Sequence, residues 1–114
     1  MTVYGMNHVA LEVTDVDLAV KFYTEVIGLK LRSQGESQAF FEMGEHQFLA
    51  LSLVKEKQPD KIRHFGIVVK DDDEIAEVRR RVEKWGLELN PSFACDFRDP
   101  FGNRIQVVDL SVVD

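Results

Sequence analysis

Asn7-His8-Val9-Ala10-Leu11-Glu12-Val13 returns in the second half of the chain as Arg63-His64-Phe65-Gly66-Ile67-Val68-Val69. Both copies read His-x-x-(Leu/Ile)-x-Val, with one imidazole at the start of an apolar run. Because successive side chains of a strand point to opposite faces, each histidine falls on the face opposite the row of large apolar side chains. The repeat therefore predicts two equivalent strands, each with one apolar face and one face that begins with a histidine.

The segments after the two strands are also repeated. Each copy is followed by an acidic turn with N-cap candidates, at residues 14–17 and 71–73, and then by apolar residues at helical spacing. Gly28 stands where a helix commonly ends. Gly28-Leu29-Lys30-Leu31 and Gly86-Leu87-Glu88-Leu89 then match as well. We infer a tandem repeat of one structural module, which cannot bury its apolar face alone.

The remaining apolar runs complete the modules. We expect strands at residues 3–13, 29–31, 39–43, 48–54, 64–69, 87–89, 93–97 and 105–110, with a polar linker at residues 55–61. The predicted fold is α+β: two βαβββ modules in tandem, at about residues 3–54 and 62–112, forming curved mixed sheets around a central cleft with the helices outside. With 114 residues, 45% of them hydrophobic, we expect a single domain over residues 1–114.

Charge and composition narrow the class of partner and compartment. A formal net charge of −6 disfavours a nucleic-acid partner. No apolar run approaches the ~20 residues that span a bilayer, and the start of the chain lacks the pattern of a signal peptide. One cysteine cannot form an internal disulfide, which suits a reducing compartment. We therefore expect a cytoplasmic protein with a small-molecule partner and no membrane association.

This arrangement resembles the vicinal oxygen chelate superfamily, which includes glyoxalase I, bleomycin-resistance, fosfomycin-resistance, methylmalonyl-CoA epimerase and extradiol-dioxygenase families. The resemblance spans residues 7–109. Its most specific pieces are Asn7-His8-Val9, Phe22-Tyr23 with Ile27-Gly28-Leu29, His64-Phe65-Gly66-Ile67, and Asp99-Pro100-Phe101-Gly102-Asn103-Arg104-Ile105. It implies the tandem fold, and in metal-binding members it implies ligands from the first and last strands of each module.

Carried over residue by residue, the resemblance implies metal ligands at His8, His64 and Gln106. The fourth matching position is Ala50, which cannot ligate. Gln106 stands where the family motif usually has a glutamate; an amide keeps an oxygen donor but removes a negative charge. The expected cofactor is a divalent ion such as Mn, Fe, Ni or Zn. The alternative is that the two histidines are polar residues of a cleft, with Gln106 hydrogen-bonded between them.

Further candidates follow from strand alternation. Glu12 shares the face of His8 and is a candidate general base or partner of a ligand, or else a solvated strand-end carboxylate. Arg104 shares the face of Gln106 and is a candidate for holding an anionic substrate, or else a surface arginine. Asp96 and Arg98 either edge the same cleft as substrate-binding residues or are simply exposed. Cys95 is expected to be packed and inert.

Two functions are consistent with these residues. The first is a small metal-dependent enzyme of the glyoxalase type, an isomerase, lyase or thiol transferase that acts on a small oxygen-rich substrate. The second is a metal-free protein similar to the bleomycin-resistance proteins, which sequesters a small molecule in a cleft between subunits. The resemblance implies a homodimer in either case.

Overall fold

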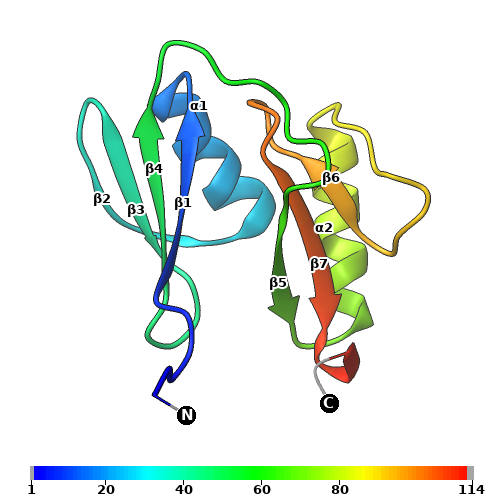
Figure 1. Cartoon of the computed structure of the whole chain (residues 1–114). Helices are drawn as coiled ribbons and strands as arrows, with labels where there is room; N and C mark the ends of the chain where they lie inside the picture. Colours follow the sequence, from blue (N-terminus) through cyan, green and yellow to red (C-terminus); the bar gives the residue numbers. More distant parts are fainter. Residues whose placement is uncertain (1, 113–114) are drawn as a thin grey trace. The chain divides into compact units, whose positions relative to one another are not determined.

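The computed structural model describes residues 2–112, and the chain forms two compact units with their boundary between Lys57 and Gln58. Unit 1 precedes this boundary and unit 2 follows it; each is described by itself (Figure 1). No helix within residues 2–112 is long and apolar enough to cross a membrane.

Unit 1 consists of a four-stranded mixed sheet and one helical segment. Its elements are β1 (His8–Val13), α1 (Val16–Phe22), a π-helical turn η1 (Tyr23–Ile27), β2 (Lys30–Gln34), β3 (Gln38–Glu42) and β4 (Phe48–Leu53). The strand order is β1-β4-β3-β2, with β1 parallel to β4 and the other pairs antiparallel. This is the strand-helix-three-strand order that the sequence predicts.

The helical segment of unit 1 begins and ends at residues suited to these positions. The side chain of Asp15 caps α1 by accepting a hydrogen bond from the backbone N–H of Leu18 at 3.0 Å. The π-helical turn ends at Gly28, whose φ of 83° is the left-handed conformation expected of a helix-terminating glycine. The role predicted for Gly28 is therefore confirmed.

One face of the unit 1 sheet is covered by α1, which packs on β3 and β4. The buried apolar side chains of the unit are Val13, Val16, Ala19, Phe22, Tyr23, Val26, Ala39, Phe41, Leu49 and Leu51. We call the other side the open face of unit 1. His8, Ala10 and Glu12 lie on it and are exposed, whereas Val9, Leu11 and Val13 alternate with them and are more buried. The predicted division of the first strand into two faces is confirmed.

Unit 2 contains a three-stranded sheet and one helix. Its elements are β5 (Phe65–Val69), α2 (Asp72–Lys84), β6 (Asp96–Arg98), β7 (Arg104–Asp109) and a short 3-10 turn η2 (Leu110–Val112). The strand order is β5-β7-β6, with β5 parallel to β7 and β6 antiparallel to it. The apolar core, to which α2 contributes against β7, consists of Val78, Val82, Cys95, Phe97, Phe101, Ile105 and Val107.

A compact hairpin loop joins β6 to β7. The Asp99 carboxylate accepts hydrogen bonds from the backbone N–H groups of Phe101 and Asn103, both at 2.9 Å, and from the Asn103 side-chain amide. Gly102 has a φ of 90° in this loop. The expected turn chemistry of residues 99–103 is therefore present, and the loop fixes which residues of β6 and β7 face one another.

The structure confirms the α+β class and corrects the predicted strands. Seven strands are formed within residues 2–112 rather than eight. The strand expected at residues 87–89 is reduced to a single bridge between Leu89 and Phe97. The strand expected at residues 93–97 forms later, at Asp96–Arg98, and the first strand begins at His8 rather than at residue 3. The central cleft and the single domain remain predictions.

Candidate functional site

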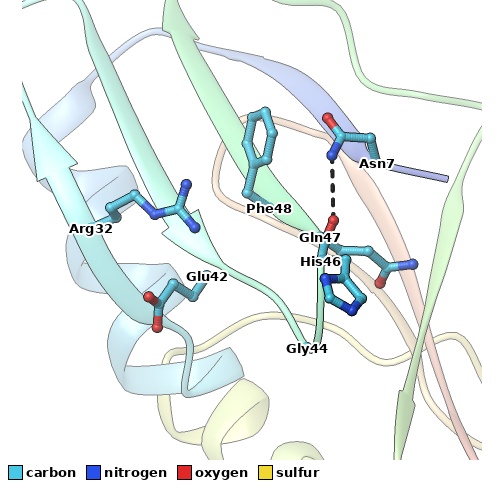
Figure 2. A pocket seen from close by; sticks show the side chains of 7 residues that line it. All are labelled: Asn7, Arg32, Glu42, Gly44, His46, Gln47 and Phe48. Atoms are coloured by element: carbon cyan, nitrogen blue, oxygen red, sulfur yellow. Dashed lines mark hydrogen bonds between the residues drawn. The ribbon is translucent and has the colours of Figure 1, made fainter.

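His8 stands at the start of the open face of unit 1 with its imidazole oriented by its neighbours. Its Nδ1 lies 2.9 Å from Oδ1 of Asn7. Because this amide oxygen can only accept, Nδ1 is the nitrogen that donates, which in the neutral imidazole leaves Nε2 as the acceptor. Asn7 is itself oriented, since its Nδ2 donates to the backbone carbonyl of His46 at 3.3 Å (Figure 2). The His8 ring also stacks on Phe48, with ring centroids 4.6 Å apart.

His64 is oriented in the same way. It immediately precedes β5, and its Nδ1 lies 2.7 Å from the carbonyl oxygen of Ile62. A carbonyl accepts only, so here too Nδ1 donates, and in the neutral imidazole Nε2 is the acceptor. A metal-binding histidine almost always donates its other ring N–H to an oxygen of this kind. Both members of the repeated histidine pair therefore have the tautomer that a ligand requires.

Gln106 is half-buried in β7, and its amide is held by a carboxylate. Its Nε2 donates to Oδ2 of Asp96 at 2.9 Å. Asp96 and Gln106 are direct partners across the antiparallel β6–β7 pair. The alternative that Asp96 is simply exposed is wrong, because its side chain is 2% exposed, and its part in substrate binding remains a prediction. The β6–β7 loop sets this pairing, because the residues on its two sides, Arg98 and Arg104, face each other. Counting two residues outward from them along each strand predicts that Asp96 faces Gln106.

Arg104 is the ionic partner of Asp96. Its Nη2 lies 2.6 Å from Asp96 Oδ2, and its Nε lies 3.1 Å from Oδ1. The hydrogen bond from Arg104 holds the pKa of the Asp96 carboxyl below its ordinary range; Gln106 and His64 act in the same direction, and burial opposes them. Asp96 and Arg104 therefore form a charged pair that is largely shielded from solvent.

The other donors of Arg104 are also engaged within the chain. Its Nη1 donates to the carbonyl oxygens of Lys61 and Ile62, at 3.1 and 3.4 Å, and its guanidinium lies 5.7 Å from the ring centroid of Phe93. Its side chain is 13% exposed, so the alternative of a surface arginine is wrong. The Ile62 carbonyl thus accepts from both Arg104 and His64. The role of Arg104 in binding a substrate remains a prediction.

The two remaining candidates have different environments. Arg98 donates through Nε and Nη2 to the backbone carbonyl of Asp60, at 2.9 and 2.7 Å, and so fastens the segment before β5 to β6. Glu12 lies on the open face of unit 1, with its side chain exposed as strand alternation predicted. Their roles in substrate binding and in catalysis, respectively, remain predictions.

Unit 1 also contains a cavity that sequence reasoning missed. It has a volume of about 460 Å³ and is lined by Asn7, Arg32, Glu42, Gly44, His46, Gln47 and Phe48 (Figure 2). The Arg32 guanidinium lies 5.9 Å from the centroid of the Phe48 ring. The same ring stacks on His8, which belongs to β1, the strand that borders β4 on the side away from β2. Arg32 lies at an irregularity in the pairing of β2 with β3, where alternation no longer predicts the face of a side chain.

The donor atoms of the three candidate ligands fit a divalent cation. Two imidazole nitrogens and one amide oxygen suit first-row divalent metals. His8 belongs to unit 1, whereas His64 and Gln106 belong to unit 2. Among residues 2–112 no group of three or more His, Cys, Asp or Glu side chains is arranged to hold a metal ion. The convergence of these three residues on one ion therefore remains a prediction.

Comparison with known proteins identifies the class. The family model of the Glyoxalase/Bleomycin resistance protein/Dioxygenase superfamily matches residues 5–107. The chain therefore belongs to this superfamily, and the resemblance to the vicinal oxygen chelate proteins is confirmed.

Among individual relatives, the metallothiol transferase FosB of Lysinibacillus sphaericus is 31% identical over 77 residues, covering 64% of this chain and 54% of that protein. The chain thus spans about half the length of this relative. The structure of a possible glyoxalase from Bacillus cereus has a TM-score of 0.77 at 26% identity, covering 92% of this chain and 98% of that one. FosX of Listeria monocytogenes, complexed with Mn(II) and sulfate, has a TM-score of 0.79 at 16% identity, covering 93% and 90%, and shares the fold.

Proposed function

We propose that this chain is a small metal-dependent enzyme whose divalent ion is held by His8, His64 and Gln106. The observation that carries the proposal is the matched orientation of the two histidines. In each, Nδ1 donates to an oxygen acceptor, so that Nε2 is the nitrogen left to bind an ion. A histidine that serves only as a polar cleft residue has no need of a fixed tautomer, whereas a ligand does.

A bound divalent ion would polarise substrate oxygens and stabilise negative charge as it develops on them. The chain's own residues would position the substrate around that chemistry. Glu12 shares the open face with His8 and is the candidate general base. The cavity beside Asn7 and Phe48 offers room for a small ligand, with the Arg32 guanidinium at its side. The reaction classes that the relatives favour are those of a lyase or isomerase and of a thiol transferase, on a small oxygen-rich substrate.

The metal proposal is tested by elemental analysis of protein purified without chelator or affinity tag. We expect about one Mn, Fe, Ni or Zn per site, and His8→Ala and His64→Ala should each weaken the measured affinity at least ~100-fold, since even outer partners of a ligand contribute 10–100-fold. His46→Asn is the matched control: it removes the third imidazole, and Asn tolerates the φ of 63° at this position. Unchanged binding in both alanine variants would sink the proposal.

A metal-free ligand-binding protein is the second candidate, and two residues favour it. Ala50 cannot ligate, and Gln106 carries no charge to hold a hard cation. Chelator-treated protein would then bind small molecules with the same affinity as protein supplied with metal. A panel of ligands, screened by thermal shift with and without divalent ions, separates this candidate from the enzyme: a ligand-induced shift that needs the ion excludes it.

A further inference from the structure

The surroundings of Gln106 give the two ends of its amide different roles. Asp96 lies directly across the β6–β7 pair, and its Oδ2 is 2.9 Å from Gln106 Nε2. A carboxylate only accepts hydrogen bonds, so the NH₂ end of the amide must face it. The carbonyl oxygen, Oε1, is then turned away from Asp96. The hydrogen-bonding chemistry of Asp96 therefore fixes the orientation of this amide.

Asp96 is held firmly enough to impose this orientation. Its side chain is 2% exposed and receives the Nε and Nη2 groups of Arg104 as well as the amide of Gln106. Arg104 in turn donates to the Ile62 carbonyl, which also accepts from His64 Nδ1. One buried ion pair is therefore connected to both candidate ligands of unit 2.

We propose that Asp96 is a positioning residue, which fixes the Gln106 amide so that Oε1 is presented as the oxygen donor to a divalent cation. The proposal rests on the proposed metal site. It explains how a glutamine serves at a position where the family usually has a glutamate. A glutamate has an acceptor at either end and needs no such partner, whereas a glutamine ligates only when its oxygen faces the ion.

The proposal predicts that the effect of changing Asp96 depends on the residue at position 106. In Asp96→Asn, the new NH₂ group attracts Gln106 Oε1, so the amide turns over and its own NH₂ group faces the ion. In Gln106→Glu, by contrast, two carboxylates stand where Asp96 and Gln106 now lie 2.9 Å apart. Adding Asp96→Asn to Gln106→Glu removes that repulsion and leaves one glutamate oxygen for the ion.

The test is a double-mutant cycle for Mn²⁺ affinity, measured by calorimetry and by the electron paramagnetic resonance of free Mn²⁺. We expect Asp96→Asn alone to weaken binding about 10–100-fold, as outer partners of ligands do. In the Gln106→Glu background the same change should leave binding equal or tighter. Asp99→Asn is the control, because it alters another buried aspartate of unit 2 that contacts Phe101 and Asn103 instead of Gln106. An equal loss in both backgrounds would overturn the proposal.

A second measurement decides the orientation of the amide without any metal, in the wild-type protein. In wild-type protein, the Gln106 side-chain NH₂ signal, assigned by its loss in Gln106→Glu, should show slow hydrogen exchange and one proton shifted downfield. Exchange as fast as that of exposed glutamines overturns the proposal. If the amide is protected and Mn²⁺ still does not bind, the proposed metal enzyme fails while the role of Asp96 in orienting the amide stands.

Discussion

At the tip of the β6–β7 loop, Gly102 combines a left-handed backbone with a very close neighbour. Its φ is 90°, and a Cβ placed on it would lie 2.6 Å from Cα of Pro59. The backbone N–H of Asp60 donates to the Gly102 carbonyl at 2.8 Å, so the two segments are held together. A side chain at position 102 would have to push the backbone of residues 59–60 away from the loop.

We therefore expect Gly102→Ala to lower the free energy of unfolding by about 2–5 kcal/mol, the sum of left-handed strain and overpacking. Gly86→Ala is the matched control, because Gly86 has a φ of 77° but nothing within 4 Å of the added Cβ. It should cost about 1–2 kcal/mol from strain alone. Urea denaturation measures both, and equal losses would show that the contact with Pro59 is unimportant.

Cys95 is a buried thiol whose ionisation is suppressed. Burial raises the pKa of the Cys95 thiol to about 11. An unfolded cysteine has a pKa of about 8.5, so the unfolded chain loses this proton first as the pH rises. The stability that the thiol contributes is therefore fully present below about pH 8.5 and is lost as the pH rises toward 11.

At pH 8, iodoacetamide should leave Cys95 of the native protein unmodified and alkylate it in concentrated urea, as read by mass spectrometry. Across the alkaline window, Cys95→Ala should lose less stability than the wild type. Equal rates of alkylation in the native and unfolded protein would contradict this description of the thiol. The expectation of a packed, inert cysteine is confirmed as far as burial is concerned.

The repeat made His8 and His64 recognisable as a pair, because matched positions in two modules are read from sequence alone, whereas Gln106 was implied by the resemblance to the family. The environment of Gln106 was harder to predict from the sequence. Asp96 and Arg104 looked like solvent-exposed or substrate-facing residues, because charged side chains near a hairpin usually are. Their burial depends on the cross-strand pairing of Asp96 with Gln106, in a strand of three residues that apolar periodicity placed too early.

Among the elements, α2 shows the clearest link from sequence to structure. Asp71 is its N-cap, and its carboxylate accepts from the backbone N–H of Glu74 at 3.1 Å. Asp72, Asp73 and Glu74 follow in the first turn, where negative charge is favourable. The helix therefore begins within the acidic turn predicted at residues 71–73.

Removing the cap should be distinguishable from removing a charge nearby. We expect Asp71→Ala to lower the free energy of unfolding by about 1 kcal/mol, because it removes a partner of an otherwise unpaired N–H group. Asp73→Ala, in the same turn, removes only a favourable charge and should cost about 0.3 kcal/mol. Thermal denaturation monitored by circular dichroism measures the difference; a larger loss in Asp73→Ala would mean that charge, not capping, starts the helix.

Other elements could not be predicted from pattern. The π-helical turn of Tyr23–Ile27 is stabilised by the packing of Tyr23 and Val26 in the core, and helical spacing alone does not distinguish it from an α-helix. The apolar residues at 87–89 match the strand that begins after Gly28, yet only Leu89 forms a bridge. Strand formation there requires a partner, and the neighbouring strand β6 has only three residues.

At the scale of the whole molecule, the tandem repeat appears as two compact units of similar size. Several large apolar side chains of unit 2 are exposed, among them Ile62, Val68 and Phe93. Exposed apolar surface of this kind is common where subunits meet. We therefore keep the homodimer implied by the resemblance as a prediction.

Light scattering coupled to size exclusion should give twice the chain mass at micromolar concentration. Dilution should shift the mass toward that of one chain without loss of circular dichroism, if each chain folds before it pairs. A mass equal to one chain throughout the micromolar range would rule the dimer out.

The Asp96–Arg104 pair also bears on how members of this superfamily are compared. The acidic side chain usual on the last strand has its counterpart here one strand away, on β6. Acids at both positions would repel each other, and amides at both would leave the orientation of position 106 undefined. The residue at position 96 therefore constrains which residue suits position 106. Aligned relatives should exchange acid and amide at the two positions together, and such covariation would mark the lineages that share this arrangement.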